Sequence, residues 1–208
     1  MKSLARHFHD VRALKNSATL LAACALLCSF SAKAQPTVAE PTAATQQAPS
    51  TATQSTLNRE LLGQAMHKLL RATINRDLET TVGYVAPRKI QKISQAMGKS
   101  REATIAELIR IGREADERNR VQVTTGFYDL DAAQYGTTSI GRSYALLPYT
   151  RTFRKEGTSV DLSYLTLASM DGDQIFITPL SDATLLPELI ELYPDLAEIR
   201  LPATGISP

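Results

Sequence analysis

The spacing of the hydrophobic side chains changes at Val121. Before this residue, apolar positions recur every three or four residues, as on one face of a helix. After it, apolar and polar residues alternate, as in a strand with one buried face. Helices followed by an antiparallel meander indicate an α+β domain. We expect a curved sheet that curls around the first helices, so that helical stripes and strand faces cover one another.

Four helices are predicted before the change in spacing. The first covers about 57–74, where apolar residues repeat at every fourth position. Asp77 can cap a short second helix, and Ser100 can cap the fourth. Pro87 suits the first turn of the third helix, and Gly98 suits its end. These signals place the four helices one after another with short connections.

The strands are predicted from alternation and from turn residues. One strand is expected near 142–147 and another beyond Pro148, which lacks an amide hydrogen and marks a bend, a bulge or an edge. Gly157 supplies a turn, and Asp171-Gly172 is a hairpin signal. The remaining expected elements are strands at 159–168 and 174–177, a short helix at 184–192, and a weak strand or extended segment at 196–201.

The first 34 residues have the layout of an export signal. Basic residues precede an apolar run of about 13 residues, and Ala32-Lys33-Ala34 follows as a small-x-small cleavage site. We expect cleavage between Ala34 and Gln35. A spanning helix needs about 20 apolar residues, which disfavours a membrane anchor. The other alternative is lipidation at Cys24, because residues 21–24 resemble a bacterial lipobox and an acyl chain would tether the protein.

Cleavage would also change the chemistry of the chain. The signal holds both cysteines, two of the three histidines and the excess of positive charge, so the net charge would change from +2 to −2. A mature chain without cysteine excludes disulfides, thiolate metal sites and cysteine nucleophiles, and we predict no cofactor and no metal. The absence of a Lys/Arg block argues against nucleic acid as a partner. The expected location is periplasmic or secreted.

The chain after the signal divides into three parts. Residues 35–56 are rich in Pro, Ala, Thr, Gln and Ser and are predicted to be a disordered linker. Residues 57–202 are predicted to form a single α+β domain, followed by a C-terminal tail at 203–208. About 150 residues are enough for one hydrophobic core. No membrane-spanning segment is expected in the mature chain.

Several segments resemble nuclear transport factor 2-like (SnoaL-like) domains. Asn75-Arg76-Asp77-Leu78-Glu79 after an amphipathic helix, followed by Tyr84-Val85-Ala86-Pro87, is similar to the opening of these domains. The segments 144–148 and 165–173 are similar to exported bacterial members, and the resemblance covers about 57–177. It implies a cone-like fold with an apolar pocket. Such members often place tryptophan after the Asp-Gly turn, where this chain has Ile175 or Phe176.

The same scaffold carries isomerases, dehydratases and hydrolases as well as modules without catalysis, so the fold does not decide the function. Enzymes of this fold generally place an acid or base inside the cone. Asp129 and Asp131 are weak candidates for that role, and a polar loop is the simpler interpretation. Alternation points Asp161 to solvent. His67 lies on the polar face of the first helix and is expected to be a solvated surface residue.

Aromatic residues are the candidates for a ligand pocket, with core packing as the alternative. They are Tyr128, Tyr144, Tyr164 and Phe176. Asp171-Gly172-Asp173 lacks the further acidic ligands of a calcium loop and indicates a tight hairpin.

We therefore expect an exported, non-catalytic module that binds a small apolar ligand or an envelope protein. One alternative is an acid/base enzyme of the isomerase or dehydratase type that uses a pocket aspartate and tyrosine. Another is a dimeric subunit of an envelope complex, with the sheet as the surface for a homodimer or a partner.

Overall fold

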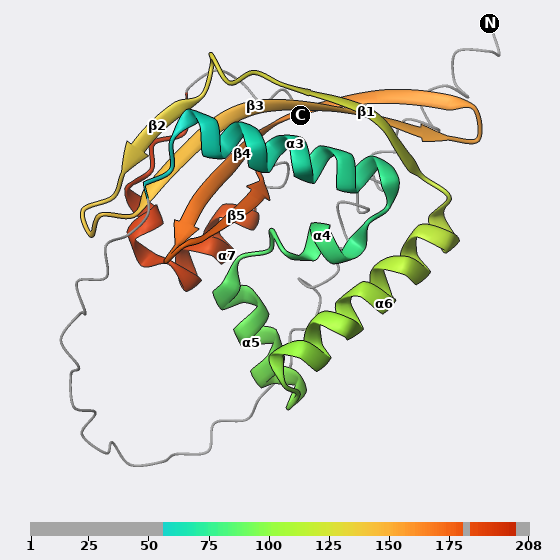
Figure 1. Ribbon diagram of the computed structural model, residues 1–208, viewed down its shortest axis with the longest axis horizontal. Coiled ribbons are helices and arrows are strands. Elements are labelled where there is room, and N and C mark those ends of the chain that lie inside the picture. Colours follow the sequence, from blue (N-terminus) through green and yellow to red (C-terminus); the bar gives the residue numbers. More distant parts are fainter. Residues whose placement is uncertain (1–55, 181–183, 203–208) are drawn as a thin grey trace, which may run out of the picture.

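The computed structural model describes residues 56–180 and 184–202 (Figure 1). The predicted signal, its cleavage site at Ala34 and Gln35, the lipidation alternative at Cys24, the linker up to residue 55 and the tail lie outside the described residues. None of the described helices is long and apolar enough to cross a membrane.

The chain forms helices first and an antiparallel sheet afterwards, which confirms the predicted α+β class. The helices are α3 (Arg59–Asn75), α4 (Leu78–Val82), α5 (Pro87–Met97), α6 (Arg101–Asn119), α7 (Leu185–Leu192) and the 3₁₀ helix η3 (Pro194–Glu198). The strands are β1 (Gln122–Tyr128), β2 (Gln134–Thr137), β3 (Ser143–Lys155), β4 (Thr158–Asp171) and β5 (Gln174–Pro179).

The helix boundaries follow from local capping chemistry. The Asp77 carboxylate accepts a hydrogen bond from the Thr80 amide at the start of α4, and the Ser100 hydroxyl accepts one from the Ala103 amide at the start of α6. Gly98 ends α5 with a left-handed φ of 60°, a conformation that glycine adopts without steric penalty. The predicted caps are thereby confirmed.

The sheet is ordered β1-β3-β4-β5. β2 pairs with the same edge of β3 as β1 does, but at the opposite end of that strand. The two strands expected on either side of Pro148 are one strand, β3, so that prediction was wrong. The Pro148 carbonyl accepts a long hydrogen bond, 3.5 Å, from the amide of Asp129, which follows β1. Pro148 therefore faces the break between β1 and β2, where its missing amide hydrogen removes no ladder bond.

The turns agree with their sequence signals, but the C-terminal segment does not. Glu156 and Gly157 both have positive φ in the β3–β4 hairpin, and Gly172 has φ 62° in the β4–β5 hairpin. The segment expected to be extended from residue 196 begins instead as part of η3. Pro194 favours this helical turn because its ring fixes φ near the helical value.

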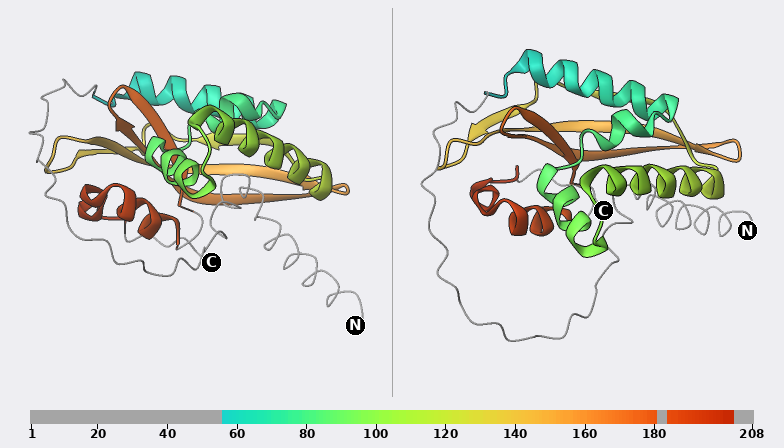
Figure 2. Two further views of the ribbon diagram at one scale, coloured as in Figure 1. Left: turned by 90° about the horizontal axis from the view of Figure 1, so that it is seen from below. Right: turned by 60° about the horizontal axis from the view of Figure 1, so that its bottom comes forward.

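Two layers of helix cover the two faces of the sheet, and Figure 2 shows α3 on one side and α7 on the other. We call these the α3 face and the α7 face. Odd-numbered residues of β3 belong to the α3 face, where Tyr149 and Leu147 pack with Leu62 and Met66 of α3. Even-numbered residues belong to the α7 face, where Leu146 packs beneath α7. Alternation thus divides one strand between two separate cores.

Helices α5 and α6 do not lie on the sheet as α3 does. They pack on one another, and α6 also packs on α4, around a small cluster formed by Val85, Ile90 and Leu108. Figure 1 shows α6 running beside the sheet and returning the chain to β1. Residues of α3, α4 and α6 nevertheless line one space together with residues of β1, β3 and β5, as expected for a sheet that curls around the first helices.

Candidate functional site: a cavity beneath α3

A cavity of about 110 Å³, partly open to solvent, lies at the α3 face. Its apolar wall comes from segments far apart in the sequence: Leu69 of α3, Val85 after α4, Val123 of β1, Phe153 of β3 and Ile177 of β5. Because each segment belongs to a different element, the fold as a whole forms this space.

A glycine in β1 allows α3 to approach the sheet closely. A Cβ atom on Gly126 would lie 2.8 Å from Leu70 Cδ1 and 3.2 Å from the Tyr149 ring. At its C-terminal end, α3 stops at Arg76, whose φ of 57° turns the chain into α4. Arg76 itself also lines the cavity. The close approach and the turn together set the shape of the helical wall.

Arg151 places a cation in this wall. It stands between Tyr149 and Phe153 on the α3 face of β3, and only 7% of its surface is exposed. Its Cζ atom lies 4.7 Å from the centroid of the Tyr149 ring and 5.8 Å from that of Tyr164. Contacts of this kind attract a guanidinium to the π-face of an aromatic ring. Most of the wall is therefore apolar, and Arg151 contributes a positive charge to it.

Three side chains with buried hydroxyl groups lie on the same face of the sheet. Tyr149 pairs with Tyr164 across β3 and β4, and their rings meet edge to face at 5.5 Å. Thr166 is the next residue of β4 on that face. All three side chains are more than nine-tenths buried, and their hydroxyls have no hydrogen-bond partner among the described residues. Buried polar groups are normally satisfied, so these three hydroxyls are exceptions to that rule among the described residues. Burial raises the pKa of Tyr164, which keeps its hydroxyl protonated.

A carboxylate and a second arginine lie in the same cavity wall. Asp116, near the end of α6, is half-buried, and burial raises its pKa while the charge of Arg76 lowers it. The charged residues of the wall are thus Arg76, Arg151 and Asp116. Cations outnumber carboxylates there by two to one.

Replacing Asp116 by Asn is expected to stabilise the protein at neutral pH by less than about 1 kcal/mol, because a half-buried carboxylate is still largely screened by water. Burial disfavours the charged form, so the folded state holds the proton more tightly than the unfolded chain does. Stability should therefore fall as the pH rises through the raised pKa, and the Asn variant lacks this loss. Thermal unfolding of the unmodified protein and the Asn variant at about pH 7 and about pH 3.5 measures the difference in stability between them. This difference should vanish at the lower pH.

Glu117→Gln is the matched control for this substitution. Glu117 is exposed and lies at the same end of α6, so its replacement reports the effect of the helix dipole alone. An equal gain in both variants would show that burial of Asp116 contributes nothing.

The predicted pocket aromatics divide between the two faces. Tyr128 and Tyr164 lie on the α3 face, where Tyr128 meets the Tyr149 ring at 6.3 Å, although neither is among the residues that line the cavity. Tyr144 and Phe176 belong to the α7 face, where they pack in the core beneath α7, and they do not line this cavity. The reason is strand parity: Tyr144 pairs with Ser169, and Ser169 in turn pairs with Phe176.

The candidate acids lie in the loop between β1 and β2, and neither lines the cavity. Asp129 Oδ1 accepts hydrogen bonds from the amides of Asp131 and Ala132, which is the geometry of a polar turn. The Asp131 side chain is 83% exposed and forms an ion pair with Arg59 at 2.6 Å.

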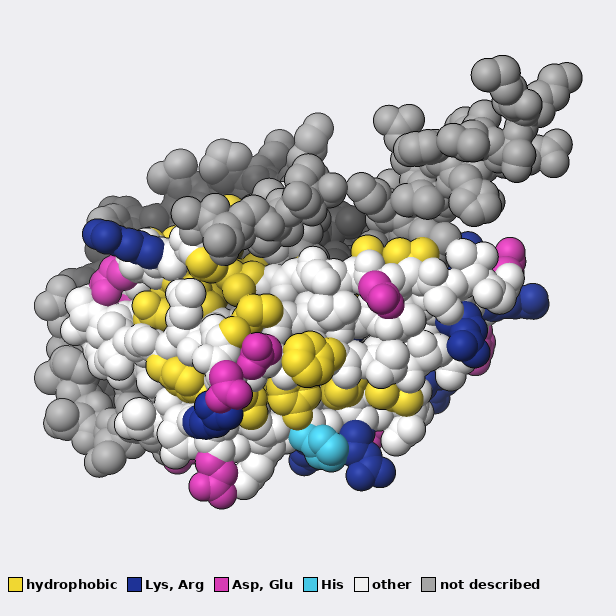
Figure 3. Space-filling model, turned by 90° about the horizontal axis from the view of Figure 1, so that it is seen from above, with side chains coloured by type: hydrophobic (Ala, Val, Ile, Leu, Met, Phe, Trp, Pro, Cys, Tyr) yellow, Lys and Arg dark blue, Asp and Glu magenta, His cyan; other side chains and the backbone are white. Residues whose placement is uncertain are grey.

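Two further residues lie where the sequence predicted them. Asp161 is exposed and accepts a hydrogen bond from the Thr152 hydroxyl, and His67 is exposed on α3. Figure 3 shows the described histidine in cyan at the surface. No group of three or more His, Cys, Asp or Glu side chains that could hold a metal ion occurs among residues 56–180 and 184–202.

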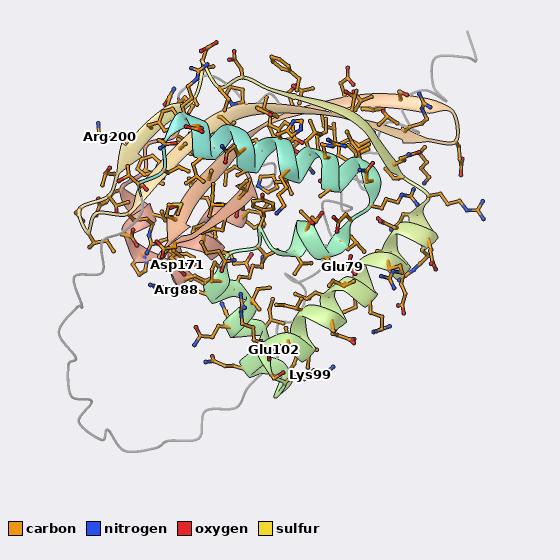
Figure 4. All side chains as sticks on the ribbon, viewed as in Figure 1. Glu79, Arg88, Lys99, Glu102, Asp171 and Arg200 are labelled. Atoms are coloured by element: carbon orange, nitrogen blue, oxygen red, sulfur yellow. The ribbon has the colours of Figure 1, made fainter. Side chains whose placement is uncertain are left out.

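A second hollow runs along α5 and is more open than the cavity. Its charged residues include Arg88, Lys99, Arg101 and Asp171. Figure 4 shows Arg88 and Asp171 next to each other, and the Arg88 Nε atom lies 3.8 Å from the Asp171 carboxylate. The Tyr193 hydroxyl also donates to this carboxylate at 2.9 Å. Asp171 is therefore part of a structural contact, and the cavity beneath α3 is the better candidate site.

Arg151 was missed at the level of sequence. The signal that could have found it is a charged residue at the centre of an otherwise apolar alternation, from Leu147 through Tyr149 to Phe153.

Comparison of the chain with protein-family models, with curated proteins and with solved structures found no match in any of the three.

Proposed function

We propose that this protein is an exported, non-catalytic module that binds a small, largely apolar molecule in the cavity beneath α3. The main support for this function is the cavity itself, because binding sites are concave, mostly apolar and lined by a few polar groups. An engineered apolar cavity of about 150 Å³ holds benzene. The cavity of about 110 Å³ is therefore suited to a short alkyl chain or a small ring.

The composition of the wall favours binding over acid/base catalysis. Among the described lining residues, the carboxylate of Asp116 has neither a histidine nor a second carboxylate beside it. General acid/base chemistry needs a positioned proton donor or acceptor with a matched pKa. Asp129 and Asp131 do not line this wall.

The proposal includes membership of the nuclear transport factor 2-like family. Two features support it: a curled antiparallel sheet follows the helices, and a long helix, α3, crosses one face of that sheet (Figures 1 and 2). A cavity between the sheet and the helices fits the pocket expected of such a cone.

Filling the cavity tests the proposed function. Val123→Phe adds volume inside the wall and is expected to weaken binding of 1-hexanol at least about tenfold, at a stability cost of about 1–3 kcal/mol for overpacking. Isothermal titration calorimetry with the full-length chain measures the affinity, and thermal unfolding measures the stability.

Val160→Phe is the matched control. Val123 and Val160 both pair with Phe153, one from each side, but only Val123 lines the cavity. The control should keep the affinity of the unmodified protein. Equal losses in both variants, or no binding of 1-hexanol by the unmodified chain, would contradict binding at this cavity.

A further inference from the structure

We propose that two copies of this chain associate through the outer edge of β1, so that the two β1 strands pair antiparallel and join the two sheets. This inference goes beyond the proposed binding function and does not depend on it. Three observations support it: β1 ends the sheet on one side, its residues leave that edge unprotected, and the charges at its two ends are opposite.

The outer edge of β1 is an open end of the sheet. No described strand pairs with that side of β1, and an edge strand presents backbone donors and acceptors that another strand can use. The opposite end of the sheet is engaged, because the Ile177 amide of β5 donates to the Tyr84 carbonyl at 2.9 Å. The Gln174 side chain of β5 also donates to the Gly83 carbonyl at 3.2 Å. The β1 edge is therefore the better place for a further strand.

The sequence of β1 does little to block this edge. Gln122–Tyr128 contains no charged residue and no proline, with which exposed edges are often protected. Phe127 is 68% exposed, more than any other large hydrophobic side chain of the described residues. Figure 1 shows β1 along the upper margin of the molecule, and Figure 3 looks down on that margin, where hydrophobic side chains gather. A second strand would cover Phe127 and pair with the backbone beside it.

One usual protection is present, but it is confined to the beginning of the strand. The register of β1 against β3 shifts between Val123 and Thr125, and such irregularities bend an edge away from a further strand. From Thr125 to Tyr128 the register is regular. The second half of β1, which includes Phe127, is therefore the part available for pairing.

The charges on either side of β1 identify the partner as a second copy. Arg118 and Arg120 precede the strand and are exposed, whereas Asp129 and Asp131 follow it. Glu117 at the first end and Arg59 at the second oppose these charges without reversing them. An antiparallel pair places the basic end of one β1 beside the acidic end of the other, and a parallel pair would place like charges together. The strand is thus complementary to itself in the antiparallel orientation.

Strand parity favours one register. Phe127 and Thr125 point to the same side of the sheet, because they pair with Thr150 and Thr152 of β3. A pairing of Phe127 with Thr125 of the other copy brings Asp131 close to Arg120 across the interface. Every contact then occurs twice, as in any symmetric dimer, and both β1 edges are covered. The assembly therefore closes at two chains.

Analytical ultracentrifugation of the full-length chain without ligand tests the inference. We expect a reversible equilibrium between monomer and dimer at about 1–300 μM, since a small interface binds weakly. Phe127→Lys should weaken association at least about a hundredfold, because it removes an apolar side chain that the dimer buries twice and adds a charge to the edge. Ile140→Lys is the matched control: Ile140 is 60% exposed between β2 and β3, and its replacement should leave the association unchanged.

A charge exchange tests the orientation of the strands. Arg120→Glu and Asp131→Lys should each weaken association about five- to thirtyfold, because each removes an attraction that occurs twice in the dimer. The double variant Arg120→Glu/Asp131→Lys should recover most of the lost affinity. Phe127, Arg120 and Asp131 are all exposed, so these variants should fold, and circular dichroism checks that they do.

The possible results separate this interface from other modes of association. A chain that remains monomeric up to about 300 μM, or that forms larger aggregates in place of a dimer, would overturn the proposal. Equal losses in Phe127→Lys and Ile140→Lys would indicate unspecific apolar association, and a dimer unaffected by Phe127→Lys would use another surface. A double variant no stronger than the single ones would exclude the antiparallel orientation. None of these results bears on the cavity, which the titration with 1-hexanol tests separately.

Discussion

A chain that stops after Leu180 is expected to lose cooperative unfolding. The truncation removes α7 and η3, whose buried side chains Leu185, Leu189, Tyr193, Leu196 and Ile199 cover the α7 face. Full burial of one such side chain is worth about 1.5–3 kcal/mol, so five contribute about 10 kcal/mol. This is as large as the whole net stability of a typical domain, which is about 5–15 kcal/mol.

Differential scanning calorimetry and near-ultraviolet circular dichroism check this expectation. The truncated chain should show no heat-absorption peak and no fixed aromatic signal, because Leu146, Leu167 and Phe176 would be exposed to water. Glu191→Gln is the control: this exposed residue of α7 forms only a surface ion pair with Lys92, worth about 1 kcal/mol or less. A sharp transition in the truncated chain would instead place the end of the domain before α7, not at residue 202.

The order and class of the elements could be predicted because their signals are local. Asp77 and Ser100 cap helices through amides three residues ahead, and Gly98 ends α5 through its own backbone conformation. Pro148 shows where this reasoning stops. Its tolerance inside β3 depends on the gap between β1 and β2, which only the tertiary pairing reveals.

The site was less predictable than the fold, for a related reason. Alternation shows that Tyr144 and Leu146 share one face and that Tyr149 and Arg151 share the other. It does not say which face contains the cavity, because helices cover both. The choice of Tyr144 therefore followed residue type, whereas Arg151 follows from the three-dimensional arrangement.

The contacts that hold the C-terminal segment were also invisible in the sequence. Arg142 at the start of β3 and Asp195 in η3 are 53 residues apart, yet Arg142 Nε donates to Asp195 Oδ2 at 2.7 Å. The same guanidinium donates to the Met170 carbonyl and lies 4.7 Å from the centroid of the Tyr193 ring. Both charged side chains are more than nine-tenths buried. No local pattern marks such a pair.

Asp195→Asn is expected to lower the free energy of unfolding by about 3–5 kcal/mol, because it leaves the buried Arg142 charge without its main counter-ion. The half-buried Asp171, 3.8 Å from the same guanidinium, is too distant to replace a hydrogen-bonded partner. Urea denaturation of both proteins at one pH measures the difference.

The double variant Arg142→Met/Asp195→Leu separates the charge from the packing. Replacing both members of a buried ion pair by apolar residues of similar volume is often neutral or stabilising, so this variant should be clearly more stable than Asp195→Asn. Glu191→Gln again provides the exposed comparison, with a change of about 1 kcal/mol or less. If Asp195→Asn were no more harmful than Glu191→Gln, the buried pair would not hold η3 against the sheet, and hydrophobic contacts alone would anchor the C-terminal segment.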